Sequence, residues 1–372
     1  MLYFANRSEI CLIQNARISP DGRSLSDVVV KNGVIHAIFP AGEIREKADR
    51  VFDAEGKLLL PGLVEVHCHG CMGMETADGP EAQVKMSEYW AEEGVTSWYP
   101  TGTTIAVSHL RRVFAKIPET PTGANIVGYH SEGPYINDKY RGAQDPNYIV
   151  PPSLADFDDL GTVKLITLAP EVEGGLEFIK KTNILPVLGH TDADYDTALA
   201  AFRNGAKCVT HLFNAMPPLH HRNPSVLGAA YDGDAYVQLI SDGVHIHPSV
   251  VRMTYRLFGA ERMILISDAV RPALLPDGDY TNLSSGGMEV VVKNGEARLK
   301  NGVLAGSTSS LYTCVQRAIS FGIPPIDAYR MASETPARMM GLRKGKIQKG
   351  YDAEFLFVDS EWKKTDVLIL NK

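Results

Sequence analysis

The sequence lacks three features that mark whole classes of protein. No apolar run approaches the roughly 18 residues of a membrane span, and the first residues, MLYFANRSEI, do not form a signal peptide. A net charge of −7 and a pI of 5.9 argue against nucleic acid as the main partner. The five cysteines are odd in number and scattered, so a disulfide framework is not expected. These absences predict a cytoplasmic protein.

The two ends of the chain differ in pattern from its middle. Residues 1–58 have the pattern of short strands with turns, and Asn32-Gly33 is a strong hairpin signal between two β runs in 26–39. Residues 345–372 are again strand-like. Neither end is long enough to bury a core alone, so we predict that the two pair into one small β-sandwich.

The middle, residues 59–344, alternates strands and helices. The candidate strands are 63–69, 95–101, 126–131, 163–168, 184–190, 207–211, 235–241 and 263–268. The candidate helices are 81–93, 194–205, 248–259, 309–322 and 325–341. This alternation predicts a (β/α)₈ barrel of the TIM type, with its active site at the C-terminal ends of the strands. Residues 211–226 are proline-rich and favour a binding loop, and 286–304 have the pattern of an inserted hairpin.

Two histidines end the first predicted barrel strand. His67 and His69 lie in LVEVHCHG, and side chains at i and i+2 of a strand point to the same face. Both imidazoles can therefore reach one point, while Cys68 points to the other side. Cys68 and Cys71 form a CxxC without a second CxxC or a thioredoxin-like context, so we do not expect them to bind metal.

Polar residues also end four other predicted strands. Glu132, His190 and His211 each follow an apolar run, where they could join His67 and His69 around a divalent transition metal, and Glu132 could bridge two ions. Asp268 ends MILISD and could move protons beside the metal. The outline is that of a metal-dependent hydrolase. Four further histidines are weaker candidates: His130, His220, His221 and His247.

Several motifs together resemble one family, and the resemblance extends over essentially the whole chain. They are HCHG (67–70), HSEGPYI (130–136), LGHTDAD (188–194), THLFNAMPPLHHRNP (210–224), SDGVHIHP (241–248), LISDAV (265–270) and LAGSTSS (304–310). The family is that of the N-acetylglucosamine-6-phosphate deacetylases, in the amidohydrolase superfamily. The resemblance implies a homodimer with a (β/α)₈ barrel and a β-sandwich built from both termini.

The resemblance also implies a ligand set and a reaction. Glu132, His190 and His211 match the ligands of the tighter metal. His67 and His69 match ligands of a second metal, so two ions per subunit are expected, Zn²⁺ or Fe²⁺. Hydroxide held at the metals would attack the N-acetyl amide of an amino-sugar 6-phosphate, with Asp268 as general base and then general acid.

Substrate contacts are implied by the same resemblance. His245 matches a histidine that contacts the phosphate ester, and Asn214 and Ala215 match a loop that offers amide groups to it. Arg222 matches an arginine that reaches a phosphate in the neighbouring subunit, for which a guanidinium is well suited. Gln144 stands where some members have a histidine that polarises the amide carbonyl; its amide can donate a hydrogen bond there but cannot be charged, so the metal would carry more of the oxyanion stabilisation.

Three alternatives stay open from the sequence. The substrate could be N-acetylgalactosamine 6-phosphate, which differs only at the C4 hydroxyl. The protein could be a cyclic-amide hydrolase such as a dihydroorotase, with Lys164 of the fourth strand carboxylated as the bridging ligand. It could also be a non-catalytic barrel protein, although such relatives typically lose metal ligands or the final aspartate, and all six positions are present here.

Overall fold

A computed structural model describes residues 1–19, 24–43, 47–281 and 289–370. Its centre is a nearly closed barrel of eight parallel strands, as the alternation of strands and helices predicted. The barrel strands in chain order are β7 (Leu63–Cys68), β10 (Val95–Gly102), β12 (Tyr129–Glu132), β13 (Val163–Leu168), β14 (Leu185–Leu188), β15 (Cys208–Val209), β16 (Tyr236–Ile240) and β17 (Met263–Ile266). A short strand, β11 (Asn125–Ile126), pairs with the first half of β10. The Asp268 backbone N–H donates to the His67 carbonyl at 3.0 Å, which brings the last strand back to the first.

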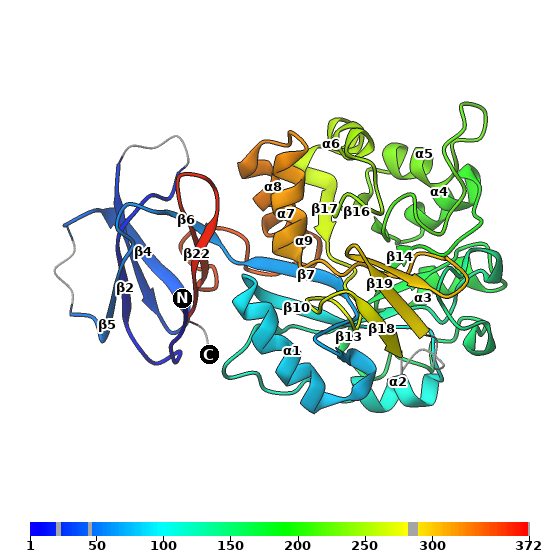
Figure 1. The fold of residues 1–372 in the computed structure, drawn as a ribbon, viewed down its shortest axis with the longest axis horizontal. Coiled ribbons are helices and arrows are strands. Elements are labelled where there is room, and N and C mark those ends of the chain that lie inside the picture. Colours follow the sequence, from blue (N-terminus) through cyan, green and yellow to red (C-terminus); the bar gives the residue numbers. More distant parts are fainter. Residues whose placement is uncertain (20–23, 44–46, 282–288, 371–372) are drawn as a thin grey trace.

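Helices surround the barrel (Figure 1). They are α1 (Pro80–Glu92), α2 (Val107–Phe114), α3 (Gly175–Lys181), α4 (Tyr195–Arg203), α5 (Ser225–Asp232), α6 (Pro248–Arg262), α7 (Leu311–Ser320), α8 (Pro325–Met331) and α9 (Glu334–Met339). Local chemistry fixes several of their ends: the Asp194 side chain accepts from the Thr197 N–H at 2.8 Å and caps α4. None of the helices in the described ranges is both long and apolar enough to cross a membrane.

Two predicted elements are each divided into two in the structure. The third barrel strand is interrupted at Gly128, where φ is 154°, so β11 and β12 replace the single run 126–131. The predicted helix 325–341 is two helices, α8 and α9, because the chain leaves helical geometry at Ser333 (φ −137°, ψ −74°).

The chain ends form two four-stranded sheets that lie side by side in Figure 1. One has the order β1 (Leu2–Phe4), β22 (Lys364–Ile369), β21 (Glu354–Val358), β6 (Leu58–Pro61), and the other β4 (Val34–Pro40), β3 (Ser26–Lys31), β2 (Cys11–Ala16), β5 (Arg50–Asp53). Asn32 and Gly33 have φ of 54° and 72°, as a two-residue hairpin turn with a right-handed twist requires. Buried side chains from both ends, among them Ile13, Val28 and Phe355, share one apolar cluster. The domain boundaries 58/59 and 344/345 stay a prediction.

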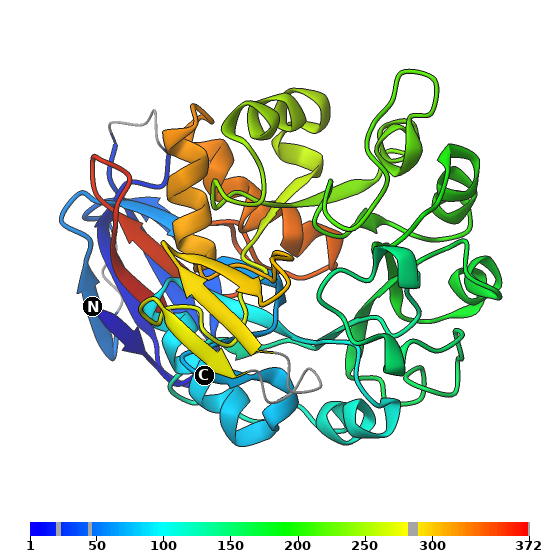
Figure 2. The same ribbon diagram turned by 45° about the vertical axis from the view of Figure 1, so that its right-hand side comes forward.

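A small antiparallel sheet projects from the chain after the last barrel strand (Figure 2). It consists of β18 (Gly278–Thr281), β19 (Glu289–Lys293) and β20 (Glu296–Leu299). The hairpin predicted over 286–304 corresponds to β19 and β20, although 286–288 lie outside the described residues, and β18 was not predicted. Side chains of this sheet help to enclose the pocket described below.

A buried ionic cluster ties the terminal sheets to the underside of the barrel. Glu354, in β21, accepts hydrogen bonds from the Thr96 and Ser97 hydroxyls of β10, both at 2.8 Å. The Lys344 ammonium donates to Glu354 and lies 3.0 Å from Asp352. Lys344 and Glu354 are both buried, so each neutralises the charge of the other at a place where water cannot solvate it.

We therefore expect Lys344→Met to lower the free energy of unfolding by about 3–5 kcal/mol, because it removes the buried ammonium group that lies against the Glu354 carboxylate. Lys346→Met is the matched control, since Lys346 is 41% exposed in its ion pair with Glu334 and should cost only about 0–1 kcal/mol. Urea denaturation of the two variants measures both effects. Equal losses would contradict the role assigned to Lys344.

Candidate metal centre and active site

The five predicted ligands and Asp268 meet at one end of the barrel. Each lies in, or one or two residues after, a different barrel strand, except that His67 and His69 share β7 and the turn that follows it. All six are buried, with at most 8% of any residue exposed. They form two groups that could each hold a metal ion: His67, His69 and Asp268, and Glu132, His190 and His211. The structure therefore brings together all the residues that the strand ends suggested.

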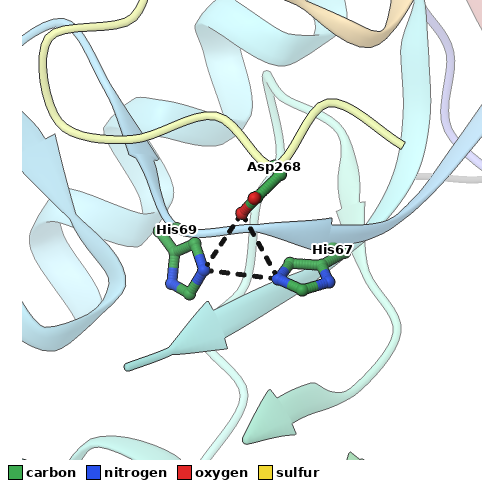
Figure 3. Close-up of side chains that lie close together, drawn as sticks. All are labelled: His67, His69 and Asp268. Atoms are coloured by element: carbon green, nitrogen blue, oxygen red, sulfur yellow. Dashed lines mark hydrogen bonds and ion pairs between the residues drawn. The ribbon is translucent and has the colours of Figure 1, made fainter. Parts of the chain in front are cut away.

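The first group is an almost equilateral triangle of ligand atoms (Figure 3). His67 Nε2 and His69 Nε2 are 3.3 Å apart, and Asp268 Oδ1 lies 3.4 and 3.3 Å from them. Both rings point toward the carboxylate, as the i, i+2 spacing on one strand predicted. Ligands on a tetrahedral ion with bonds of about 2.0–2.1 Å are about 3.3 Å apart, so the triangle fits one face of such a site.

The second group has the same dimensions. Glu132 Oε1 lies 3.2 Å from His190 Nε2 and 3.0 Å from His211 Nε2, and the two nitrogens are 3.1 Å apart. Glu132 also reaches the first group, with Oε1 3.2 Å from His67 Nε2 and Oε2 3.2 Å from His69 Nε2. The carboxylate thus lies between the two triangles, where a bridging ligand would be.

Neighbouring acceptors set which nitrogen of each ring faces the site. The Tyr140 carbonyl oxygen lies 2.9 Å from His190 Nδ1, and a carbonyl can only accept, so Nδ1 carries the proton. In the neutral ring, the Nε2 lone pair of His190 then points at Glu132 and His211. Gln238 Oε1 lies 3.0 Å from His67 Nδ1, so Nδ1 of His67 also carries the proton and its Nε2 lone pair faces the site. Nitrogen lone pairs and a carboxylate that face one another at about 3 Å repel unless a cation lies between them. The residues therefore fit a divalent metal ion.

Without a metal, protons take the place of the cation. Burial opposes protonation of His69, but Asp268 and Glu132 outweigh it and raise the pKa of His69 to about 10. Burial likewise opposes ionisation of Glu132, yet His67 and His190 hold its pKa well below the usual value. The pKa of Asp268 is also lowered, since His67 and His69 overcome its burial. The site is therefore built to hold negative carboxylates around positive charge.

Three of the six residues have strained backbones. His190, His211 and Asp268 have φ of 48°, 26° and 48°, in the left-handed region that residues other than glycine rarely adopt. Each follows the last residue of its strand, which ends earlier than predicted: β14 at Leu188, β15 at Val209 and β17 at Ile266. Strain of this kind persists where the surrounding structure holds it and is concentrated at functional sites.

Several weaker candidates belong to neither of the two groups. His130 is buried beside His67, but its Nδ1 and Nε2 lie 3.3 and 2.8 Å from the Thr101 and Thr167 hydroxyls. Cys68 and Cys71 belong to the apolar core, and neither is part of the two metal groups found among the described residues. Lys164 is exposed near the amino end of β13, away from the strand ends that carry the site, which removes the support for a carboxylated lysine.

A pocket of about 280 Å³ lies over the two groups. Four of the five predicted substrate contacts line it: Gln144, Asn214, Ala215 and His245. Its outer wall is apolar and includes Tyr280, Val290 and Leu299 of the small antiparallel sheet. Arg222 is not among the lining residues; it is exposed, with Nη1 2.7 Å from His221 Nε2.

Sequence reasoning did not identify several residues that support the site. Asp242 accepts from His245 Nδ1 at 2.7 Å, and His245 Nε2 lies 3.0 Å from the Ala305 carbonyl, so both ring nitrogens of His245 have acceptors. Gln238 and Glu65 lie inside the barrel, and burial raises the pKa of Glu65 to about 7. The sequence signal that could have identified these two residues is a polar residue inside an otherwise apolar strand: Gln238 in YVQLI and Glu65 in LVEV.

Comparison with known proteins points to one family. Residues 180–371 match the amidohydrolase family. The chain is 35% identical to the N-acetylgalactosamine-6-phosphate deacetylase of Escherichia coli O157:H7, over 89% of this chain and 90% of that protein. It is 34% identical to the N-acetylglucosamine-6-phosphate deacetylase of Bacillus subtilis, over 86% of this chain and 83% of that protein.

Solved structures similar to this chain include enzymes with the same name. The N-acetylglucosamine-6-phosphate deacetylase of Thermotoga maritima superposes with a TM-score of 0.85 at 29% identity, covering 97% of this chain and 98% of that one. A mutant of the Mycobacterium smegmatis enzyme, solved in complex with N-acetyl-D-glucosamine 6-phosphate, has a TM-score of 0.84 at 27% identity, covering 96% and 97%.

The two groups predict separable losses of metal. His190→Asn should remove the ion held by Glu132, His190 and His211, and His69→Asn should remove the ion beside Asp268, because each takes one ligand from a three-residue group. Elemental analysis after dialysis against a single metal measures the content. His247→Asn, at an exposed histidine that caps α6, should change nothing. Metal content that is the same in all three variants would contradict the assignment.

Proposed function

The chain belongs to the amidohydrolase family, and on that basis we propose that it hydrolyses N-acetylglucosamine 6-phosphate to glucosamine 6-phosphate and acetate. The observation that carries the proposal is a pair of ligand triangles at the floor of a substrate-sized pocket, with Glu132 belonging to one triangle and contacting both histidines of the other. Curated relatives at 32–35% identity over most of the chain are named as deacetylases of amino-sugar 6-phosphates.

In this proposal the subunit holds two divalent ions, Zn²⁺ or Fe²⁺. Glu132, His190 and His211 would hold one of them. His67 and His69 would hold the other, and Glu132 would contribute to both. When bound, the ions supply a water of lowered pKa and a Lewis acid for the acyl oxygen. Imidazole and carboxylate ligands suit either metal, and availability in the cell selects between them.

Asp268 is the proton carrier of the proposed reaction. Its carboxylate is buried beside His67 and His69, and its pKa is low enough for it to begin the cycle ionised. It takes a proton from the attacking water and returns that proton to the sugar nitrogen as the C–N bond breaks. The amine therefore leaves neutral, and no covalent bond to the protein forms.

The substrate's phosphate requires contacts away from the metals. Asn214, Ala215 and His245 line the pocket and are the proposed contacts within the subunit. Arg222 lies outside this pocket on an exposed loop, which fits the proposal that the protein is a homodimer in which Arg222 reaches the neighbouring subunit's phosphate. A cytoplasmic location remains a prediction from the sequence.

N-Acetylgalactosamine 6-phosphate is the second candidate substrate. The observation that favours it is the Escherichia coli O157:H7 relative, which is named for that sugar and matches 89% of this chain. The reaction and the metal centre would be the same, because the two sugars differ only at C4.

Acetate release from three substrates tests the proposed function. We expect N-acetylglucosamine 6-phosphate to be hydrolysed with the highest kcat/KM, ahead of its galactosamine epimer and far ahead of unphosphorylated N-acetylglucosamine. A preference for the epimer would establish the second candidate. No acetate from any of the three, with metal bound, would refute both.

Asp268→Asn tests the proton carrier. We expect kcat to fall by about 10²–10⁴-fold, the usual contribution of general acid–base catalysis, while the metal held by Glu132, His190 and His211 is retained. Asp279→Asn, at an exposed position in β18, is the control and should keep wild-type turnover. Wild-type kcat in Asp268→Asn would remove Asp268 from the mechanism.

Arg222→Ala tests the contact across the dimer. We expect KM for the phosphorylated substrate to rise about 10- to 100-fold with little change in kcat, because a charge-assisted hydrogen bond to phosphate contributes about 1.5–3 kcal/mol. Arg203→Ala, at an exposed arginine of α4, is the control. If Arg222→Ala weakens phosphorylated and unphosphorylated sugars equally, the side chain is structural.

A further inference from the structure

We propose that Gln144 is a positioning residue that fixes the orientation of the Glu132 carboxylate and so sets the affinity for the ion between His67 and His69. The proposal rests on the metal centre of the proposed function. It gives Gln144 a different role from that of the histidine found at this position in some relatives, because the amide acts here through Glu132 rather than only on the acyl oxygen.

The orientation of the Gln144 amide is determined by its neighbours. The backbone N–H of Thr104 donates to Gln144 Oε1 at 2.8 Å, and the Thr103 hydroxyl donates to the same atom at 2.5 Å. A backbone N–H can only donate, so the amide atom facing it must be the oxygen. The amide nitrogen then faces Glu132, and it donates to Oε2 at 2.6 Å.

This hydrogen bond acts on the last torsion of the Glu132 side chain, which sets where the two carboxylate oxygens point. The last torsion of a glutamate side chain is broad, so its two oxygens exchange positions easily unless each has its own partner. Oε1 faces His190 and His211 and also lies 3.2 Å from His67, whereas Oε2 faces His69. A donor on Oε2 keeps that oxygen beside His69 of the first ligand group while Oε1 stays beside the second group. Gln144 therefore favours the bridging arrangement.

The surroundings hold Gln144 and Glu132 together as one rigid unit. Gln144 is only 7% exposed, and the Thr104 hydroxyl donates to the Glu132 carbonyl at 3.2 Å. The next residue, Gly133, has φ of 80°, and a Cβ there would lie 2.2 Å from the Thr104 hydroxyl. Thr103 and Thr104 thus hold the amide on one side and the glutamate backbone on the other.

Gln144→Glu is the sharpest test, because it keeps the shape of the side chain and an oxygen for Thr103 and Thr104 but replaces the donor that faces Glu132. We expect the second Zn²⁺ to bind at least 10- to 100-fold more weakly in calorimetric titrations of the metal-free full-length protein, with the first site less affected. Gln144→His can still donate one N–H and should retain the second ion better. Asn147→Asp adds the same charge to the same exposed loop and should bind both ions as the wild type does.

The outcomes separate this proposal from the proposed function. Wild-type affinity for both ions in Gln144→Glu, with an unchanged melting temperature, would overturn it, as would a wild-type protein that binds only one ion. If the wild type binds two ions, Gln144→Glu loses one and no acetate is released from any amino-sugar phosphate, the positioning role stands and the proposed function fails. A loss in Asn147→Asp equal to that in Gln144→Glu would mean that loop charge, not the hydrogen bond, is responsible, and would also overturn the proposal.

Discussion

The Glu132 carboxylate lies 3.0 to 3.2 Å from the Nε2 atoms of four histidines that come from three separate parts of the chain. Removed from water, this arrangement is stable only with positive charge inside it, supplied by protons in the metal-free protein and by metal ions when they bind. Other residues at this end of the barrel orient the histidines or add negative charge. Tyr140 and Gln238 orient two of the rings, and Asp268 adds a second carboxylate 3.3 Å from His69 Nε2.

The barrel makes such a cluster possible because it brings many strand ends to one place. The strands alone are not sufficient, however. His190, His211 and Asp268 turn inward from backbones in the left-handed region, and hydrogen bonds such as that from the Asp268 N–H to the His67 carbonyl help to hold them there. The energetic cost of this geometry is met by the structure that surrounds these residues.

Local patterns in the sequence predicted much of this arrangement. Strand 163–168 has the predicted bounds, Asn32-Gly33 forms the predicted turn, and the residues after the strands converge as the barrel rule requires. Features that depend on distant contacts were not predictable. The hydrogen bond between His67 and Gln238 joins residues 171 positions apart, and the contact of Gln144 with Glu132 depends on how a loop folds back over the barrel. The break between α8 and α9 was missed although Pro336 follows it closely, because the apolar spacing continues through Ser333.

In the proposed metal centre, one carboxylate serves two metal ions. Anomalous diffraction from crystals grown with Zn²⁺ or Fe²⁺, recorded on both sides of the absorption edge, tests it without reference to activity. The account predicts two peaks, one among Glu132, His190 and His211 and the other between His67 and His69, with an oxygen of Glu132 bound to each. A single peak, or two peaks with Glu132 bound to only one of them, would contradict it.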